Sequence, residues 1–167
     1  MTTPNSSFAL FLADFRATIM GATARLRTLT EAQSRRKTSS DAWSPIEVVG
    51  HLVDSAANNH QRFVRAQFTD DLVFPGYEQD GWVSVQKYQA ESWPDLIQLW
   101  SSYNLHLLHL ASVIPEDTLT KSREKHNLDQ LAFKTVSADK PTTLEYFIRD
   151  YVDHLRHHLG QIFDETS

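Results

Sequence analysis

Three histidines lie within five residues near the end of the chain, in the segment DHLRHHLGQI (153–162). On a helix, successive residues are turned by about 100°, so His154 and His158 point to the same side. His157 points away from them, toward the solvated side. Two imidazoles at this i, i+4 spacing can share one metal ion. The same spacing can arise by chance among eight histidines, and a single inward histidine is usually a hydrogen-bonded core residue.

The sequence excludes or disfavours several kinds of metal site. A zinc protease motif, His-Glu-x-x-His, would need glutamate where Leu155 stands. The chain has no cysteine, which excludes disulfides, iron–sulfur clusters and thiolate-bound zinc. It also contains no Glu-x-x-His, so a di-iron carboxylate bundle is disfavoured. A metal ion in this protein would therefore need histidine, carboxylate or water ligands.

The other histidines of the chain are candidates for a third ligand. His60 falls on the apolar face of its predicted helix, which favours a core role. His106 and His109 flank an apolar stripe without polar neighbours, and His126 lies in a polar connection. His51 remains as a candidate for the third ligand, because its sequence neighbours differ from those of the other histidines.

His51 follows Gly50, and a glycine allows another backbone to come close. The face that His51 shares is polar and carries Asp54, Ser55, Asn58 and Arg62. Such a face borders either solvent or a wet cavity between helices. Periodicity alone does not decide between these two.

Apolar residues with helical spacing predict four helices that would have to position these side chains. The four stripes cover residues 8–29, 46–64, 96–114 and 144–162. A polar loop (31–42) follows the first stripe, and the later connections, 68–92 and 115–142, are long. Long connections argue against an up-down-up-down bundle with tight turns. We therefore expect an all-α protein with one domain over residues 1–167, a four-helix bundle with long crossover connections.

The start of the second helix is the best defined. Ser44 is a suitable N-cap, Pro45 suits the first helical position, and Glu47 completes a capping box. This helix is expected to continue to about Gln67.

Similar signals mark the other two later helices. Ser92 is expected to cap the third helix and Pro115 to stop it, and Thr142 with Glu145 suits a capping box for the fourth. A short helix around 83–89 is expected within the middle connection.

Two segments resemble a known family, the DinB-like (YfiT-like) superfamily. They are WSPIEVVGHLVDSA (43–56) and YVDHLRHHLGQI (151–162). The shared pattern is a Trp-Ser-Pro helix start, then His-Leu-x-Asp, and a late His-x-x-x-His before Gln-Ile. The resemblance extends over the whole chain, including PGYEQDGWVSVQKYQ in the middle.

The resemblance implies a metal site, because in that family three histidines bind a divalent ion in a cavity of the bundle. His51 matches the ligand of the second helix, and His154 and His158 match the pair of the fourth. His157 matches a neighbouring position that is not a ligand. Asp54 also matches a position of the motif, and its role stays open between a helix-surface or structural residue and a residue that supports the ligands.

The resemblance also implies a chemistry. Relatives include S-transferases and isomerases that use low-molecular-weight thiols such as bacillithiol or mycothiol, with the thiol sulfur bound to the metal as thiolate. Three neutral imidazoles with open positions fit Zn²⁺ or Ni²⁺ best, and Mn²⁺ or Fe²⁺ are also compatible. We expect a metal-dependent enzyme, a thiol-dependent S-transferase or a hydrolase, acting on a small electrophile. The alternative is a non-catalytic, stress-associated bundle that binds metal or a partner.

Aromatic residues of the middle connection, Tyr77, Trp82 and Tyr88, could line the mouth of a pocket or cover the end of the bundle. Relatives are commonly homodimers, and the broad apolar stripes favour a dimer here. A net charge of −5 argues against nucleic-acid binding. No apolar run has membrane-spanning length and no leader segment is recognisable, so we expect a cytoplasmic protein.

Overall fold

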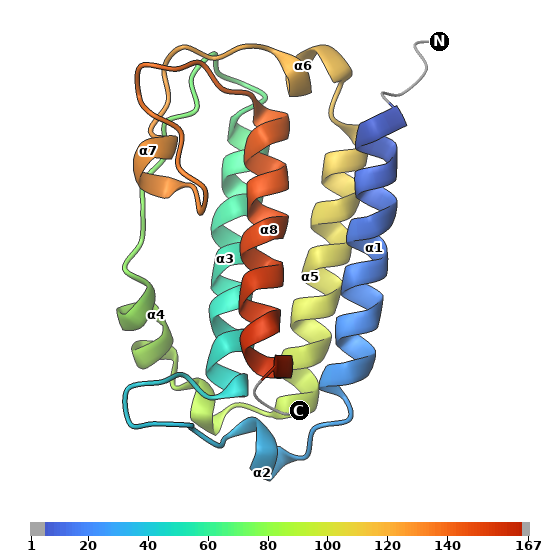
Figure 1. Cartoon of the computed structure of the whole chain (residues 1–167), viewed down its shortest axis with the longest axis vertical. Helices are drawn as coiled ribbons and strands as arrows, with labels where there is room; N and C mark the ends of the chain where they lie inside the picture. Colours follow the sequence, from blue (N-terminus) through green and yellow to red (C-terminus); the bar gives the residue numbers. More distant parts are fainter. Residues whose placement is uncertain (1–5, 165–167) are drawn as a thin grey trace.

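The computed structural model describes residues 6–164, and these contain no β-strand, only helices and two isolated β-bridges. Four helices of 21 residues form the bundle (Figure 1): α1 (Ser6–Leu26), α3 (Pro45–Arg65), α5 (Trp93–Val113) and α8 (Leu144–Asp164). The connections carry shorter helices: α2 (Glu31–Ser34), α4 (Gln79–Gln86), the 3₁₀ helix η1 (Tyr88–Ala90), α6 (Glu116–Thr120) and α7 (Leu128–Leu131). The predicted all-α four-helix bundle is confirmed.

The helices α3 and α5 are neighbours and run in the same direction, while α1 and α8 run in the opposite direction (Figure 1). A chain that leaves the end of α3 must therefore return along the whole bundle before α5 can begin. That return path carries α4 and η1, which both pack on α3. This topology explains why the connection before α5 is long.

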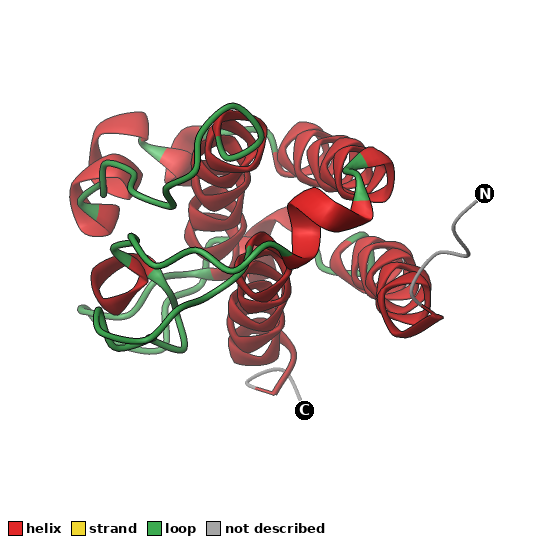
Figure 2. Cartoon of the chain, turned by 90° about the horizontal axis from the view of Figure 1, so that it is seen from above, coloured by secondary structure: helices red, strands yellow, loops and turns green. Residues whose placement is uncertain are grey.

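Viewed down the bundle axis, the loops gather on one side (Figure 2), which Figure 1 places beside α3 and α8. Two of them are tied together by a bridge between Leu72 and His126. The Nε2 atom of His126 lies 2.7 Å from the carbonyl oxygen of Lys140, and its Nδ1 accepts the N–H of Leu128 at 3.1 Å. His126 therefore has a structural role in the polar connection.

The predicted start of the second bundle helix is confirmed. The carboxylate of Glu47 accepts hydrogen bonds from the backbone N–H and the hydroxyl of Ser44, both at 2.8 Å, and Pro45 begins α3. Ser92 also caps α5 as expected, because its hydroxyl accepts the N–H of Asp95 at 3.4 Å.

Two local predictions were wrong. The cap of α8 is Thr143, whose hydroxyl accepts the N–H of Tyr146 at 3.0 Å. Thr142 takes part instead in a β-bridge, so its backbone is already paired outside the helix. The polar connection before α3 is also not entirely loop, because a capping box of Thr30 and Gln33 begins the short helix α2 within it.

The core between α3 and α8 contains aromatic side chains that pack edge to face. The ring centroid of Phe63 on α3 lies 5.7 Å from that of Phe147 and 5.8 Å from that of Tyr151 on α8. The hydroxyl of Tyr151 donates to Asn104 of α5 at 2.6 Å. These contacts fix the separation of α3 and α8, the two helices that carry the candidate ligands. None of the helices described is long and apolar enough to cross a membrane.

Candidate metal centre

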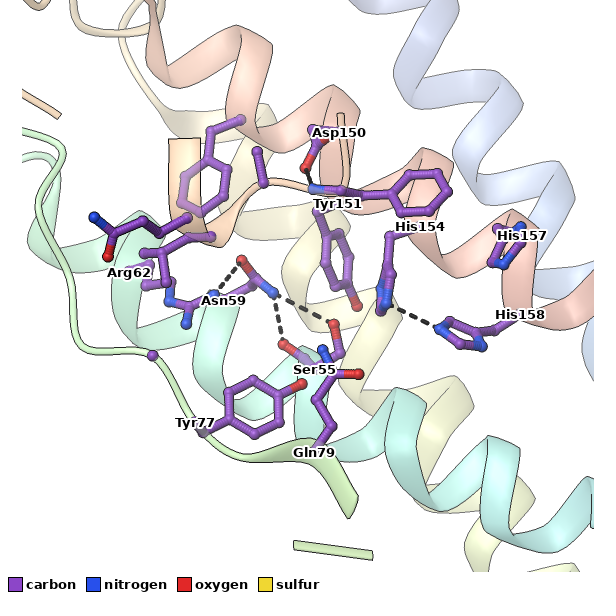
Figure 3. A pocket seen from close by; sticks show the side chains of 16 residues that line it. Ser55, Asn59, Arg62, Tyr77, Gln79, Asp150, Tyr151, His154, His157 and His158 are labelled. Atoms are coloured by element: carbon purple, nitrogen blue, oxygen red, sulfur yellow. Dashed lines mark hydrogen bonds between the residues drawn. The ribbon is translucent and has the colours of Figure 1, made fainter. Parts of the chain in front are cut away.

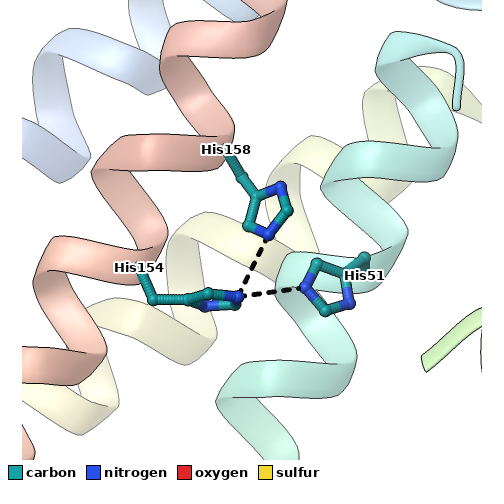
Figure 4. Close-up of side chains that lie close together, drawn as sticks. All are labelled: His51, His154 and His158. Atoms are coloured by element: carbon teal, nitrogen blue, oxygen red, sulfur yellow. Dashed lines mark hydrogen bonds between the residues drawn. The ribbon is translucent and has the colours of Figure 1, made fainter. Parts of the chain in front are cut away.

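The structure brings together the three histidines implied by the resemblance (Figure 4). His154 lies between the other two: its Nε2 is 3.3 Å from Nε2 of His51 and 3.0 Å from Nε2 of His158. Two ligand atoms that each lie about 2.0–2.1 Å from one ion are about 2.8–3.4 Å apart when the angle at the ion is between 90° (octahedral) and 109.5° (tetrahedral). Both separations from His154 fall in this range, and all three ligand atoms lie within 4.8 Å of one another. Within residues 6–164, this is the one cluster of three or more histidine or carboxylate side chains close enough to share an ion.

Each histidine is positioned by its helix. His154 and His158 follow one another by one turn of α8, and His51 faces them from α3, which runs antiparallel beside α8. His51 is fully buried, whereas His154 and His158 are partly buried. His157 is exposed, as its position on the helix predicted. The polar face of His51 therefore borders the inside of the protein.

Burial keeps the three imidazoles neutral. Burial, together with the charge that His158 would carry, lowers the pKa of His51 to about 3. Burial, with the neighbouring histidines, lowers the pKa of His154 to about 3 as well, and burial also lowers the pKa of His158. Neutral imidazoles with free lone pairs are the form that binds metal.

The side chain of Gln161 orients one of these rings. Its Oε1 lies 2.8 Å from Nδ1 of His158, so Nδ1 carries the proton and Nε2 keeps a lone pair directed at the cluster. Nδ1 of His51 is buried and has no hydrogen-bond partner in the described part of the chain. Its ring packs instead on Trp43, with 4.9 Å between the centroids.

Sequence reasoning missed Asp150, which lies one turn before His154 on α8. Its buried carboxylate accepts the backbone N–H groups of Phe133 and Lys134, at 2.8 and 2.6 Å. This holds the ring of Phe133 5.6 Å from that of His154 and 5.1 Å from that of His157. The i, i+4 spacing from His154 was a signal that could have identified Asp150.

The role of Asp54 is structural. Its side chain is buried, and its Oδ1 accepts the hydroxyl of Tyr88 at 2.7 Å and the amide of Gln86 at 2.8 Å. These bonds fasten α4 and η1 to α3. Burial raises the pKa of Asp54, and the hydrogen bonds from Gln86 and Tyr88 oppose that shift.

The three aromatic residues of the middle connection have different positions. Tyr77 lines the cavity beside the cluster, and Trp82 packs on Tyr77 with 4.9 Å between ring centroids. Tyr88 is buried on α3 and is not among the residues that line this cavity. The side chain of His60, expected in the core, is only partly buried, and its Nδ1 lies 3.2 Å from the hydroxyl of Tyr103.

Two cavities border the cluster. The first, of about 420 Å³, lies between α3, α8 and the connections, with His154 and His158 at one side and Arg62 at the other (Figure 3). The second, of about 410 Å³, is lined by Trp43 among others, and both cavities reach His158 and Gln79. Each has the volume of a small-molecule site.

Comparison with known proteins agrees with this architecture. The structure is similar to that of YfiT from Bacillus subtilis, described as a probable metal-dependent hydrolase with an unusual four-helix bundle topology. The TM-score is 0.72 at 18% sequence identity, and the match covers 92% of this chain and 84% of the other. No curated protein matches the sequence. The family model of the DinB superfamily matches residues 14–162, and the chain belongs to that superfamily.

Proposed function

We propose that His51, His154 and His158 bind one divalent metal ion and that the protein is a metal-dependent enzyme. The observation that carries this proposal is the spacing of the three Nε2 atoms, 3.0 and 3.3 Å from the central one. Zn²⁺ or Ni²⁺ suits three imidazoles best, with Mn²⁺ or Fe²⁺ also compatible. Bound in this way, such an ion keeps its charge and an open position, and it lowers the pKa of a coordinated water or thiol toward neutrality.

The side chains around the cluster would prepare it for this role. Gln161 fixes the tautomer of His158, as its 2.8 Å contact with Nδ1 requires. Trp43 packs on the ring of His51, and Phe133 packs on the ring of His154. These rings limit the access of water to the ligands and leave the two cavities as the routes of approach.

The reaction that we propose is transfer of a small electrophilic group to a low-molecular-weight thiol, with hydrolysis as the alternative when water is the nucleophile. Two cavities that meet at His158 support a reaction of two substrates, one in each cavity. The chain has no cysteine, so a sulfur nucleophile would come with the thiol. In the transfer, sulfur forms a bond to the electrophilic carbon, the leaving group departs with the bonding electrons, and the thiol proton passes to it through water.

A screen of thiols against electrophiles tests this function. Protein loaded with Zn²⁺ or Ni²⁺ would be mixed with bacillithiol, mycothiol or simpler thiols and with a panel of alkylating agents and esters. We expect turnover that requires the metal, and His154→Ala should abolish it. Thiol dependence would select transfer, and its absence would select hydrolysis. Metal binding without turnover of any pair would favour the second candidate, a non-catalytic bundle.

We propose a homodimer as the functional form, supported by large apolar side chains that are exposed on the outside of α1 and α5, Leu10, Met20, Leu99 and Val113. Light scattering should then give twice the 19.1 kDa mass of the chain. A monomer at micromolar concentration would contradict this proposal. The net charge of −5 supports a small molecule, and not a nucleic acid, as the ligand.

A further inference from the structure

Arg62 is a buried cation at the side of the first cavity away from the histidines (Figure 3). Its side chain is only 6% exposed, and no carboxylate in the described part of the chain forms an ion pair with it. Its position in the last turn of α3 favours a positive charge there, because carbonyl groups converge at the end of a helix. A buried charge without a counter-charge is costly, so the guanidinium calls for a physical explanation.

The hydrogen bonds of Arg62 satisfy only part of its capacity. Nη2 donates to the carbonyl oxygen of Pro75 at 3.0 Å, and Nη1 makes a long contact of 3.5 Å with Oδ1 of Asn59. A guanidinium has five N–H donors. Arg123, also buried without a carboxylate, differs because it donates to carbonyl oxygens of Ala66, Thr69 and Thr118 and does not line this cavity.

The other groups near Arg62 are suited to an anionic ligand. Asn59 and Ser55 are hydrogen-bonded to each other, and both line the cavity with Tyr77. Burial raises the pKa of Tyr77 to about 12, so its hydroxyl is neutral and can donate. The one carboxylate in the lining is that of Asp150, which already accepts two backbone N–H groups.

We propose that Arg62 binds a carboxylate group of the substrate, whose reacting atom lies at the three histidines. The planar fork of a guanidinium matches the two oxygens of a carboxylate. His51 and Arg62 are about three turns apart on α3, or about 16 Å along its axis. The substrate class is therefore carboxylic acids in which an extended chain separates the electrophilic or ester group from the carboxylate. The part of this inference that places the reacting atom at the histidines rests on the proposed function. The part that places the substrate's carboxylate at Arg62 does not depend on that function.

Binding of simple probes tests the carboxylate site without any turnover. Propionate, its neutral counterpart propionamide, and inorganic phosphate would be titrated into wild-type protein, both zinc-loaded and metal-stripped, with calorimetry and NMR as readouts. We expect propionate to bind both forms, propionamide to bind neither, and phosphate to bind more weakly than propionate. The Nε–H resonance of Arg62 should shift on addition of propionate.

Variants at position 62 test whether Arg62 itself binds the carboxylate. Arg62→Gln should weaken propionate binding to the metal-stripped protein roughly tenfold or more, and Arg62→Lys should restore part of it. The matched control is Arg65→Gln, which removes an exposed cation from the same turn of α3 and should change nothing. Unchanged melting temperature and zinc content would show that Arg62→Gln is folded.

Three results would overturn the inference: equal binding of propionate by Arg62→Gln and wild type, equal binding of propionamide, or a preference for phosphate. If Arg62→Gln does not fold, an unshifted Nε–H resonance in the wild type would overturn it as well. Failure of the metal proposal would look different, because zinc would then not bind the histidines while propionate still bound the metal-stripped protein.

Discussion

The ring of Tyr88 packs directly on the backbone of α3 at Gly50. A Cβ atom at position 50 would lie 2.2 Å from Cδ2 of that ring, far inside van der Waals contact. One turn further along α3, Asp54 accepts the hydroxyl of Tyr88 at 2.7 Å. The sequence indicated that Gly50 would allow a close approach, but it is a side chain, and not a backbone, that makes it. This contact fixes the middle connection against the helix that carries His51.

We expect Gly50→Ala to destabilise the protein by about 1–3 kcal/mol, because the added methyl group would displace the ring of Tyr88. This loss would exceed the gain of up to about 1 kcal/mol that alanine brings to a helix. The matched control is Gly21→Ala in α1, where no atom other than those of the two chain neighbours and the local helix backbone lies within 4 Å of the added methyl group. That variant should be at least as stable as the wild type. Urea unfolding of both variants measures the difference, and equal stabilities would refute the packing argument.

The four bundle helices were predictable because their signals are local. Helical spacing of apolar residues and the Ser44–Glu47 capping pattern depend on neighbours in the sequence, and the structure has both. Thr142 was misassigned because its bridge to Arg123 is a contact between distant segments. For the same reason, sequence alone could not show the role proposed for Arg62, because that role depends on a cavity built from several segments in which no carboxylate pairs with the guanidinium.

The cluster of three histidines was predictable from the sequence only in part. The period of a single helix places His154 and His158 on the same side of α8 and turns His157 outward. That His51 joins them depends on how α3 and α8 pack, and only the family resemblance indicated it beforehand. The structure shows that meeting through the 3.3 Å separation of the Nε2 atoms of His51 and His154.

We expect Asp150→Asn to loosen the connection that covers the cavity. An amide oxygen can replace only part of what a carboxylate provides to the N–H groups of Phe133 and Lys134, so a loss of about 1–3 kcal/mol is expected. Hydrogen exchange of these two backbone amides should become faster, while that of the buried amides of α5 should change less. Asp153→Asn is the control, because Asp153 pairs with Lys134 on the surface and should contribute less than about 1 kcal/mol. Unchanged exchange at Phe133 in Asp150→Asn would contradict the anchoring role.

The stability of the metal-free protein should depend on pH through His51 and His154. Burial lowers the pKa of both to about 3 in the folded state, against about 6.5 for an unperturbed histidine in the unfolded chain. Between these values the unfolded chain binds more protons, so the free energy of unfolding falls as pH decreases below about 6.5 and is unaffected by these groups above it. Each histidine contributes a slope of about 1.4 kcal/mol per pH unit.

Urea unfolding in the presence of a chelator, at pH 7.5, 5.5 and 4.5, measures this dependence. The buried carboxyls of Asp54 and Asp150, whose pKa values are raised, act in the opposite direction, so the comparison with a variant is the informative one. His51→Gln should reduce the slope between pH 5.5 and 4.5 by about 1.4 kcal/mol per pH unit. A variant with the wild-type slope would show that His51 is not buried in its neutral form.

The central claim is that the cluster of His51, His154 and His158 binds one divalent ion, and metal content is its most direct test. Wild-type protein, His154→Ala and His157→Ala would be stripped, reloaded with Zn²⁺ or Ni²⁺, and analysed for metal per chain after removal of the excess. We expect one ion per chain in the wild type and in His157→Ala, because His157 is exposed and lies outside the cluster. His154→Ala should bind none, because it removes the nitrogen that lies 3.0 and 3.3 Å from the other two. Equal metal content in the two variants would contradict the account.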